Sequence, residues 1–336
     1  MATILDVARK AGVSKSTVSR VINNEGTVKP ATRKAVEDAI EKLGYFPSYF
    51  AQGMRTGFTK TIAMVVPEYT NPFYQEMFRG VEDVALKYGY MVFVCNTERH
   101  TVSDVEYTRE LLKRNIDGII YNTYHRNDEV SEYLKKVSKQ IPIVFMDKIF
   151  DDCSEVSYVY VDGFESVRRA VRYLYNQGHR RIGYILNTED ISVIQERYLG
   201  YLKGLEDCGL EADEKWIYRV RRENEPDYIK LGKDAARYYV SLAERPDVIM
   251  AAIDMIGIGC IKGLDILNIK VPEEIGVMGF DNIQLSDLIK PALTTISQPT
   301  RKLGQTAAEI VIAKINGEKI KDQVVFQGDL IVRETT

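Results

Sequence analysis

The chain has 336 residues, of which 45% are hydrophobic and 28% are charged, values typical of a globular protein with two or three domains. It contains no run of about 18 apolar residues, so we expect no transmembrane helix and no membrane partner. The first residues, MATILDVARK, carry charge and lack the apolar core of a signal peptide. We therefore expect neither export nor a membrane-spanning segment, and these features predict a cytoplasmic protein.

The cysteines and histidines are too scattered for a metal site or a disulfide framework. They are Cys95, Cys153, Cys208 and Cys260, and His100, His125 and His179. None of the spacings that identify zinc ligands is present, and separate free thiols fit a reducing compartment. We therefore expect no metal and no cofactor.

The charge is unevenly distributed. Residues 1–57 hold nine Lys and Arg against five Asp and Glu, a balance of +4, whereas the remainder has a balance of −7 within the net charge of −3. A basic head on an acidic body is typical of a protein whose head binds nucleic acid. A chance distribution is the alternative that the charge alone leaves open.

The first 46 residues have the pattern of three short helices. Thr3 is a plausible N-cap for the first helix, and Gly12 is expected to end it. Ser14 can cap the second helix. Pro30 suits the first position of the third helix, and Gly44 suits the position just after its end.

This order of helices is that of a helix-turn-helix domain, whose second helix lies in the major groove with its N-terminal residues against base edges. The polar residues on the outward face of the second helix are Lys15, Ser16, Thr17, Ser19, Arg20 and Asn23. Lys15 and Ser16 could read bases, the Arg20 fork fits guanine O6 and N7, and the others could hold phosphates. A solvated polar face is the alternative, but it does not explain the short, hydroxylated, cationic tip. The pattern therefore favours double-stranded DNA as a partner.

Residues 47–58 read as a linker. Pro47 breaks the chain, Ser48 can cap a short segment, and Gly53 costs a helix about 1 kcal/mol relative to alanine. A helix in this segment would form only if contacts with something else stabilised it. Met54 is unusual in an exposed linker unless it packs against something.

The stretches TILDVARKAGVSKSTVSRVIN and VKPATRKAVEDAIEKLGYFP closely resemble the N-terminal domain of the lac repressor (LacI/GalR) family. In that family the segment after the proline is a hinge helix that folds on operator binding, pairs with its dimer mate and inserts a leucine into the minor groove. The resemblance implies that Met54 is the matching wedge, and that Thr3 and Ala51 also contact DNA. Ser48, Gln52 and Gly53 depart from the family pattern and suggest a hinge that is harder to order.

From Thr59 onward, β-branched apolar runs alternate with helical segments. Strands are expected at 61–67, 90–96, 117–122, 141–147, 181–186, 247–253 and 275–281, with helices such as 74–88, 104–114 and 167–177 between them. This alternation predicts parallel sheets covered on both faces. About 275 residues are many for one sheet, so we expect two Rossmann-like lobes with a ligand at the carboxyl ends of the strands.

The body resembles the effector domain of the same family, which is like a periplasmic sugar-binding protein. The markers are NPFYQEMFRGVEDVA (71–85), DGII (117–120), IVFMDK (143–148), GHRRIGYI (178–185), ERYLGYLKGL (196–205), IGVMGFDN (275–282), and PALTTISQP with LGQTAAE (291–309). The resemblance covers the whole chain. It implies an all-α helix-turn-helix domain at 1–46, a hinge at 47–58, and an α/β two-lobed effector-binding and dimerisation domain at 59–336.

The same resemblance places three crossovers between the lobes, near Asp162, Pro291 and Gln323. The N-lobe is then expected at about 59–161 and 292–322, and the C-lobe at about 162–291 and 323–336.

Polar side chains at the expected strand ends could hold a ligand between the lobes. Sugar rings stack on aromatic faces, while their hydroxyls bind carboxylates and guanidinium groups. With the family positions, this gives the candidate effector-binding residues Phe73, Tyr74, Asp147, Lys148, Arg197, Tyr228, Asp281 and Gln298. The alternatives are that Asp147 and Asp281 are caps, that Arg197 forms a structural ion pair, and that Phe73 belongs to the core.

One departure bears on the ligand. Where the family often has Asn-Asp, with the Asn contacting the effector, this chain has Ile253-Asp254. A hydrogen bond is therefore lost, and the effector is either less polar at that edge or bound in a different pose.

No motif indicates an enzyme. The glycines of GIGCIKG lack the spacing of a dinucleotide fingerprint, and no P-loop, G-x-S-x-G or Cys/His pairing appears. We expect a homodimeric transcriptional regulator, a repressor of a sugar-utilisation operon controlled by a small carbohydrate. The chain stops at Glu334-Thr335-Thr336 without a heptad tail, which favours a dimer over a tetramer.

Two alternatives keep the DNA-binding head but change the partner of the body. The stretch VKPATRKAV resembles the catabolite control proteins, which respond to a phosphorylated carrier protein. A nucleobase-responsive repressor is the other alternative.

Overall fold

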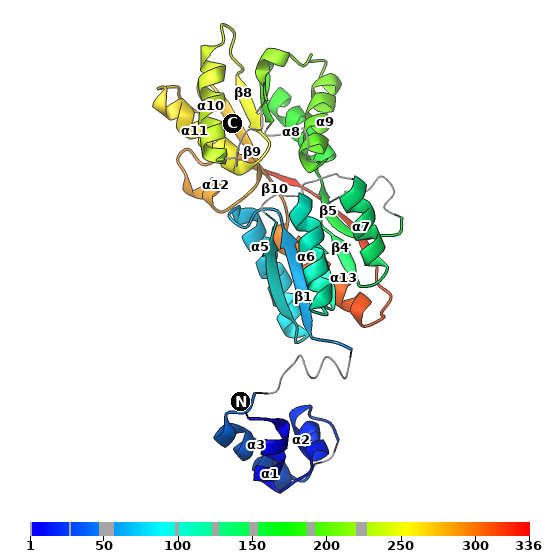
Figure 1. Ribbon diagram of the computed structural model, residues 1–336. Helices are drawn as coiled ribbons and strands as arrows, with labels where there is room; N and C mark the ends of the chain where they lie inside the picture. Colours follow the sequence, from blue (N-terminus) through cyan, green and yellow to red (C-terminus); the bar gives the residue numbers. More distant parts are fainter. Residues whose placement is uncertain are drawn as a thin grey trace. The chain divides into compact units, whose positions relative to one another are not determined.

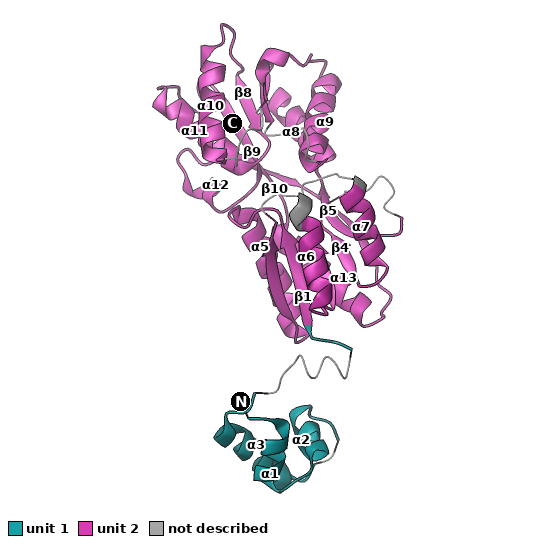
Figure 2. Cartoon of the chain, viewed as in Figure 1, with its two compact units in different colours: residues 1–60 teal, residues 61–336 magenta. Residues whose placement is uncertain are grey.

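The computed structural model describes residues 2–26, 28–46, 57–97, 101–122, 128–147, 154–186, 192–219 and 227–336 (Figure 1). The chain divides into two compact units, Met1–Lys60 and Thr61–Thr336 (Figure 2). Each unit has its own hydrophobic core. Within the described residues, no helix combines the length and apolar character needed to cross a membrane.

The first unit contains three helices, α1 (Ile4–Ala11), α2 (Lys15–Ile22) and α3 (Pro30–Leu43). Their local signals are those that the sequence predicts. Thr3 and Asp6 form a capping box, and the Ser14 hydroxyl accepts from the Thr17 backbone N–H. Gly12 and Gly44 adopt the left-handed conformation that ends a helix. Val7, Val18 and Val36 are fully buried where the helices meet, so each helix contributes to one core.

The first lobe of the second unit is a parallel sheet in the order β11-β5-β4-β3-β1-β2. Its strands are β1 (Thr61–Val66), β2 (Met91–Asn96), β3 (Gly118–Tyr121), β4 (Ile143–Phe145), β5 (Ser157–Asp162) and β11 (Gln323–Gln327). Its helices are α5 (Pro72–Lys87), α6 (Thr101–Lys113), α7 (Asp128–Ser138) and α13 (Thr300–Ile315). Two separate hydrophobic clusters, one with α5 and α13 and one with α6 and α7, cover the two faces.

The second lobe has a sheet in the order β12-β10-β9-β8-β6-β7. Its strands are β6 (Ile182–Leu186), β7 (Ile217–Arg219), β8 (Val248–Ala251), β9 (Gly276–Asp281), β10 (Thr294–Ser297) and β12 (Asp329–Ile331). Its helices are α8 (Gly163–Asn176), α9 (Ser192–Asp207), η1 (Glu214–Trp216), α10 (Tyr228–Ser241), α11 (Asp254–Ile266) and α12 (Leu285–Leu288). All its strand pairs are parallel except β10 with β12. The two-lobed α/β fold is therefore confirmed.

Two of the three predicted crossovers lie elsewhere. The first is at Asp162, where β5 of one sheet ends and α8 of the other lobe begins. The second was expected near Pro291, but β10 still pairs with β9, so the chain crosses after Ser297. The third was expected near Gln323, but β11 pairs with β5, and the crossing follows Gln327. Residues 292–297 thus lie in the C-lobe and 323–327 in the N-lobe, because pairing with distant strands, not local pattern, decides the sheet.

Helix α5 is held firmly against α13 in the first lobe. A side chain at Gly80 would overlap the carbonyl oxygen of Arg301, and one at Gly304 would overlap that of Met77. The two helices therefore touch backbone to backbone, which only glycine allows. This contact fixes the N-terminal end of α5, which faces the second lobe.

Candidate functional site

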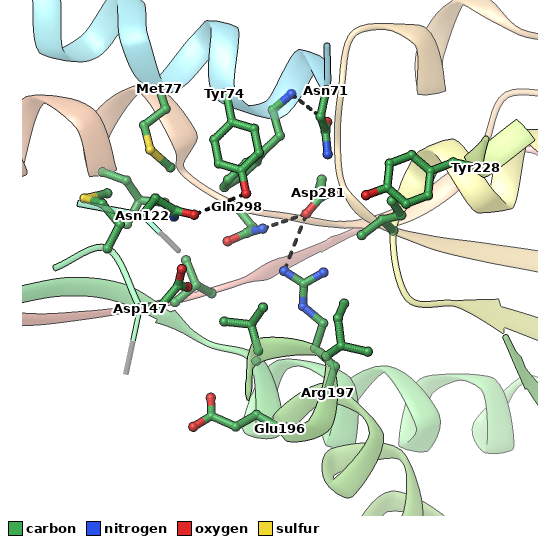
Figure 3. Close-up of a pocket in the computed structure, with 18 residues that line it drawn as sticks. Asn71, Tyr74, Met77, Asn122, Asp147, Glu196, Arg197, Tyr228, Asp281 and Gln298 are labelled. Atoms are coloured by element: carbon green, nitrogen blue, oxygen red, sulfur yellow. Dashed lines mark hydrogen bonds and ion pairs between the residues drawn. The ribbon is translucent and has the colours of Figure 1, made fainter. Parts of the chain in front are cut away.

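A cavity lies between the two lobes of the second unit, where the carboxyl ends of the strands meet (Figure 3). Its lining comprises Asn71, Phe73, Tyr74, Met77, Asn122, Met146, Asp147, Val161, Gly163, Val193, Ile194, Glu196, Arg197, Tyr228, Ile253, Asp281, Gln298 and Leu303. The free volume is about 50 Å³. That is room for a few water molecules and far below the roughly 300 Å³ of a small ligand site. The cleft is therefore nearly closed, and a sugar-sized ligand requires it to widen.

The first lobe contributes the start of α5 to this cavity. Asn71 caps the helix by accepting from the Phe73 backbone N–H at 3.0 Å, and Pro72 suits the first helical position. The Phe73 and Tyr74 rings pack edge to face with centroids 5.2 Å apart. The Tyr74 hydroxyl donates to Asn122 Oδ1 at 3.2 Å, which ties α5 to the end of β3.

The second lobe contributes an arginine that is held on three sides. Arg197 of α9 is 8% exposed, and its Nη1 donates to the Ala252 carbonyl at 2.7 Å. Its guanidinium lies over the Phe280 ring, 3.7 Å from the centroid, and its Nη2 is 3.6 Å from Asp281 Oδ1. Gln298 Nε2 donates to the same oxygen at 2.7 Å. Arg197 thus lines the cavity and also forms a structural ion pair with Asp281.

Asp281 has an unusual backbone. Its φ is 124°, a conformation that residues with side chains rarely adopt. Such conformations persist where the surroundings over-determine them, and they cluster at functional sites. The strained turn at the end of β9 aims this carboxylate at Arg197.

Two carboxyl groups of the cavity hold their protons unusually tightly. Burial raises the pKa of Asp147 to about 8, which Arg197 opposes and Glu196 reinforces. Burial likewise raises the pKa of Asp281 to about 7, against the effects of Arg197 and the Gln298 hydrogen bond. Near neutral pH, burial therefore keeps most of Asp147 and a substantial part of Asp281 in the neutral acid form.

The shifted pKa of Asp147 predicts a pH-dependent stability. A carboxyl whose pKa is raised on folding stabilises the fold fully below its ordinary pKa near 4 and loses that contribution as the pH rises towards 8. We expect the free energy of unfolding to fall between pH 6 and pH 8 by about 2 kcal/mol more in the native protein than in Asp147→Asn. Urea denaturation at both pH values measures this difference, and equal pH dependence in the two proteins would refute the shift.

One hydrogen bond crosses from lobe to lobe beside the cavity. Tyr228, the first residue of α10, donates through its hydroxyl to Glu68 Oε2 at 2.9 Å. Glu68 follows β1 in the first lobe, so this contact links the two lobes directly. It favours the closed cleft.

Removing this hydroxyl should favour the open cleft. Tyr228→Phe keeps the aromatic wall but loses a hydrogen bond worth about 1 kcal/mol, so amide hydrogen exchange next to Glu68 and Tyr228 should become about fivefold faster. Tyr74→Phe is the matched control, because its bond to Asn122 lies within one lobe. Exchange unchanged in Tyr228→Phe, or equally faster in both variants, would show that the bond does not hold the lobes together.

The structure brings seven of the predicted effector residues to one cavity, namely Phe73, Tyr74, Asp147, Arg197, Tyr228, Asp281 and Gln298. Lys148 lies outside the described residues. Ile253 also lines the cavity, so the apolar replacement of the family's Asn does face this space. Their role in binding stays a prediction.

Sequence reasoning missed several lining residues. Asn122 follows β3 directly, and the same strand-end argument that selected Asp147 could have found it. Glu196 precedes Arg197 on α9, but nothing in the sequence shows that both face the cavity. Among the described residues, no group of His, Cys, Asp and Glu side chains could hold a metal ion.

In the first unit, α2 presents the predicted DNA-contacting face to solvent. Lys15, Ser16 and Arg20 are exposed, whereas Thr17, Ser19 and Asn23 are half-buried. Thr3 is exposed and uses its hydroxyl in the capping box. Ala51 and Met54 lie outside the described residues, so the hinge and its wedge stay predictions.

A small hydroxyl network orders the tip of α2. The Ser14 hydroxyl lies 2.8 Å from the Ser16 hydroxyl and 2.9 Å from that of Thr17, besides capping the helix. Ser14→Ala should destabilise α2 by about 1 kcal/mol, whereas Ser14→Asp keeps a capping oxygen. Amide hydrogen exchange of α2 in the full-length protein should be faster in the alanine variant than in the aspartate variant. The same rate in all three proteins would exclude a capping role.

Comparison with known proteins gives matches to both units. Residues 3–48 match the family described as bacterial regulatory proteins, lacI family, and residues 59–331 match periplasmic binding proteins and sugar binding domain of LacI family. The HTH-type transcriptional repressor PurR of Photobacterium profundum is 34% identical over 346 residues, which cover 100% of this chain and 98% of PurR.

Two solved structures resemble this chain over nearly its whole length. The complex of the transcriptional regulator CelR with cellobiose has a TM-score of 0.74 and 30% identity, with 100% of both chains covered. The lac repressor dimer bound to operator and the anti-inducer ONPF has a TM-score of 0.88 at 23% identity, covering 99% of this chain and 98% of that chain. At that identity the second likeness shows the fold alone.

Proposed function

This chain belongs to the LacI family of bacterial DNA-binding transcriptional regulators, and from that membership we propose that it is a homodimeric repressor of a sugar-utilisation operon. A small carbohydrate bound between its two lobes would control its affinity for operator DNA. The observation that carries this proposal is the interlobe cavity, in which aromatic rings and carboxylates stand together. A DNA-binding regulator works where the chromosome lies, so we place it in the cytoplasm.

The chemistry of the cavity wall favours a sugar. The rings of Phe73, Tyr74 and Tyr228 offer apolar faces, and Asp147 offers a hydrogen-bond acceptor. Sites with convergent polar groups on an apolar wall orient small ligands in this way. The full-length relative CelR is bound to cellobiose, which is consistent with this chemistry.

The proposed head follows the geometry of a helix-turn-helix. The exposed tip of α2 would enter the major groove, with Lys15, Ser16 and Arg20 facing bases and the half-buried Thr17, Ser19 and Asn23 near the phosphates. Each subunit of a dimer reads one half-site, so the operator should be pseudo-palindromic. Met54 of the hinge would kink the DNA from the minor groove.

Ligand control requires two states that bind the effector differently. The nearly closed cleft with its Tyr228–Glu68 bond is one of them. An effector of sugar size must widen the cleft, and it gains affinity only in the state that has room for it. Widening of the cleft would then change the order of the hinge and the affinity for operator.

The test combines DNA selection with a ligand panel on the full-length protein. A pseudo-palindromic site should emerge from random DNA, and one saccharide class should raise the melting temperature in a concentration-dependent way and alter operator affinity. A shift with nucleobases alone would replace the carbohydrate by a nucleobase. No shift with any small molecule would favour a protein co-regulator of the catabolite-control type, and absence of a selected site would overturn the DNA-binding role.

A further inference from the structure

Two consecutive residues at the end of β9 have positive φ angles. Asp281 has φ 124°, which residues with side chains rarely adopt, and Asn282 has φ 57°, in the left-handed region. Asp281 is the cavity carboxyl that faces Arg197 and accepts from Gln298 Nε2. Backbone strain of this kind persists only where the surrounding contacts over-determine it. The contacts around this turn therefore decide where the Asp281 carboxyl lies.

Asp254 holds the turn from inside the lobe. Its side chain is fully buried at the start of α11, and its Oδ2 accepts from the Ile283 backbone N–H at 2.9 Å and from the Ser286 hydroxyl at 2.6 Å. Its Oδ1 accepts from the Thr295 hydroxyl at 2.6 Å. These bonds fix the residues that follow Asn282, and the Asn282 side chain has partners of its own.

The Asn282 side chain is held by Arg333, near the end of the sequence. Arg333 Nη2 donates to Asn282 Oδ1 at 2.7 Å, and Arg333 Nη1 donates to the Leu293 carbonyl at 2.7 Å. The Arg333 side chain is only 15% exposed, so salt and water screen these bonds weakly. Asn282 Nδ2 donates to the Ser297 hydroxyl at 3.1 Å. The Asn282 amide thus links Arg333 to the residue that precedes Gln298.

The backbone around Arg333 is anchored as well. The Arg333 N–H donates to Thr294 Oγ1 at 2.9 Å. Thr335 is fully buried, and its hydroxyl accepts from the Thr294 backbone N–H at 2.8 Å, while its carbonyl accepts from the Val277 N–H at 2.9 Å. An arginine that is fixed at its backbone and at its guanidinium can hold a neighbouring turn in one position.

We propose that Arg333 is a positioning residue of the effector site, which acts through Asn282 on the Asp281 carboxyl, although neither Arg333 nor Asn282 is among the described residues that line the cavity. This inference rests on the proposed effector site and adds a residue that sets its geometry. Without the bond from Arg333 the Asn282 carbonyl loses its donor, and the strained turn relaxes towards ordinary φ values. The Asp281 carboxyl then moves away from Arg197 Nη2 and Gln298 Nε2.

A titration of the Asp281 carboxyl reports its position without any ligand. Burial raises the pKa of Asp281 to about 7, whereas Arg197 and the Gln298 hydrogen bond lower it and Asp254 raises it. In Arg333→Met the two lowering contacts weaken while the carboxyl stays buried, so its titration midpoint should rise. NMR of the full-length protein with isotope-labelled aspartate carboxyls measures this midpoint, and Asp281→Asn identifies the signal.

Two further variants separate positioning from a general loss of stability. Asn282→Gly lacks the amide but adopts φ 57° freely, so it should raise the midpoint, and the double variant with Arg333→Met should raise it no further. Glu334→Ala is the matched control, because it removes bonds to the Ala292 N–H and to Lys290 without touching Asn282. An unchanged midpoint in Arg333→Met or in Asn282→Gly would overturn the inference, as would an equal rise in Glu334→Ala.

Ligand binding separates this inference from the proposed function. Cellobiose, maltose and glucose are titrated calorimetrically into the native protein and into Arg333→Met. A sugar that binds the native protein should bind the variant about tenfold more weakly, as expected when a charge-assisted hydrogen bond is misplaced. Operator affinity without sugar should stay within about threefold. Equal sugar affinity in both proteins would overturn the inference. Binding of none of these sugars to the native protein would count against the proposed carbohydrate effector, and the midpoint of Asp281 would still decide the role of Arg333.

Discussion

Replacing Arg197 by alanine is expected to abolish the response to effector and to lower the free energy of unfolding by about 3 kcal/mol. The guanidinium is the partner of a buried carboxylate, Asp281, and the donor to the Ala252 carbonyl. Removing one member of such a pair leaves the other buried and uncompensated, which costs more than the pair itself contributes. The helices of the first unit contain none of these contacts, so operator affinity without effector should stay within about threefold.

The loss of unfolding free energy in Arg197→Ala should depend on the protonation of Asp281. Without Arg197 the pKa of this carboxyl rises further above 7, so the variant loses less stability at pH 6 than at pH 8. Urea denaturation at both pH values measures this, and operator titration with and without effector measures the response. Adding Asp281→Asn to the variant should recover part of the lost stability. A variant that still responds to effector would remove Arg197 from the binding site.

Replacing Arg20 by alanine is expected to weaken operator binding by about 1–3 kcal/mol and to relax specificity at one base pair. Arg20 is exposed near the end of α2, and no described contact uses its guanidinium. The change should therefore leave the head folded. A bidentate pair with guanine O6 and N7 discriminates against other bases by a similar amount.

Titrations against operators with each base pair replaced in turn measure this effect. In the native protein, replacing the base pair at one position of the operator should weaken binding strongly. In Arg20→Ala, operators with any of the four bases at that position should bind alike. Arg20→Lys is the matched control, because it keeps the charge but loses the planar fork. Uniform weakening on every sequence, with the lysine variant restoring affinity, would identify Arg20 as a phosphate contact.

Local signals in the sequence suffice to place the helices of the first unit. The signals that start and end these helices act within a few residues, so the local pattern suffices to place the helices. They are capping by Thr3 and Ser14, the proline at the start of α3 and the glycines after α1 and α3. The alternation of apolar runs and helical segments likewise predicted two parallel sheets, because burial on both faces leaves a signal in each strand.

The way in which distant segments combine depends on long-range pairing in the folded chain. The sequences of the short strands β10 and β11 do not show to which sheet each belongs. Only the pairing of β10 with β9 and of β11 with β5 places them. Two of the three crossovers therefore lie at other residues than the sequence predicted. The pairing of charges in the cleft is also non-local. Arg197 and Asp281 come from separate elements, and their mutual neutralisation follows from a 3.6 Å approach that no spacing encodes. Local patterns specify elements, but charges and strands find their partners only when the chain has folded.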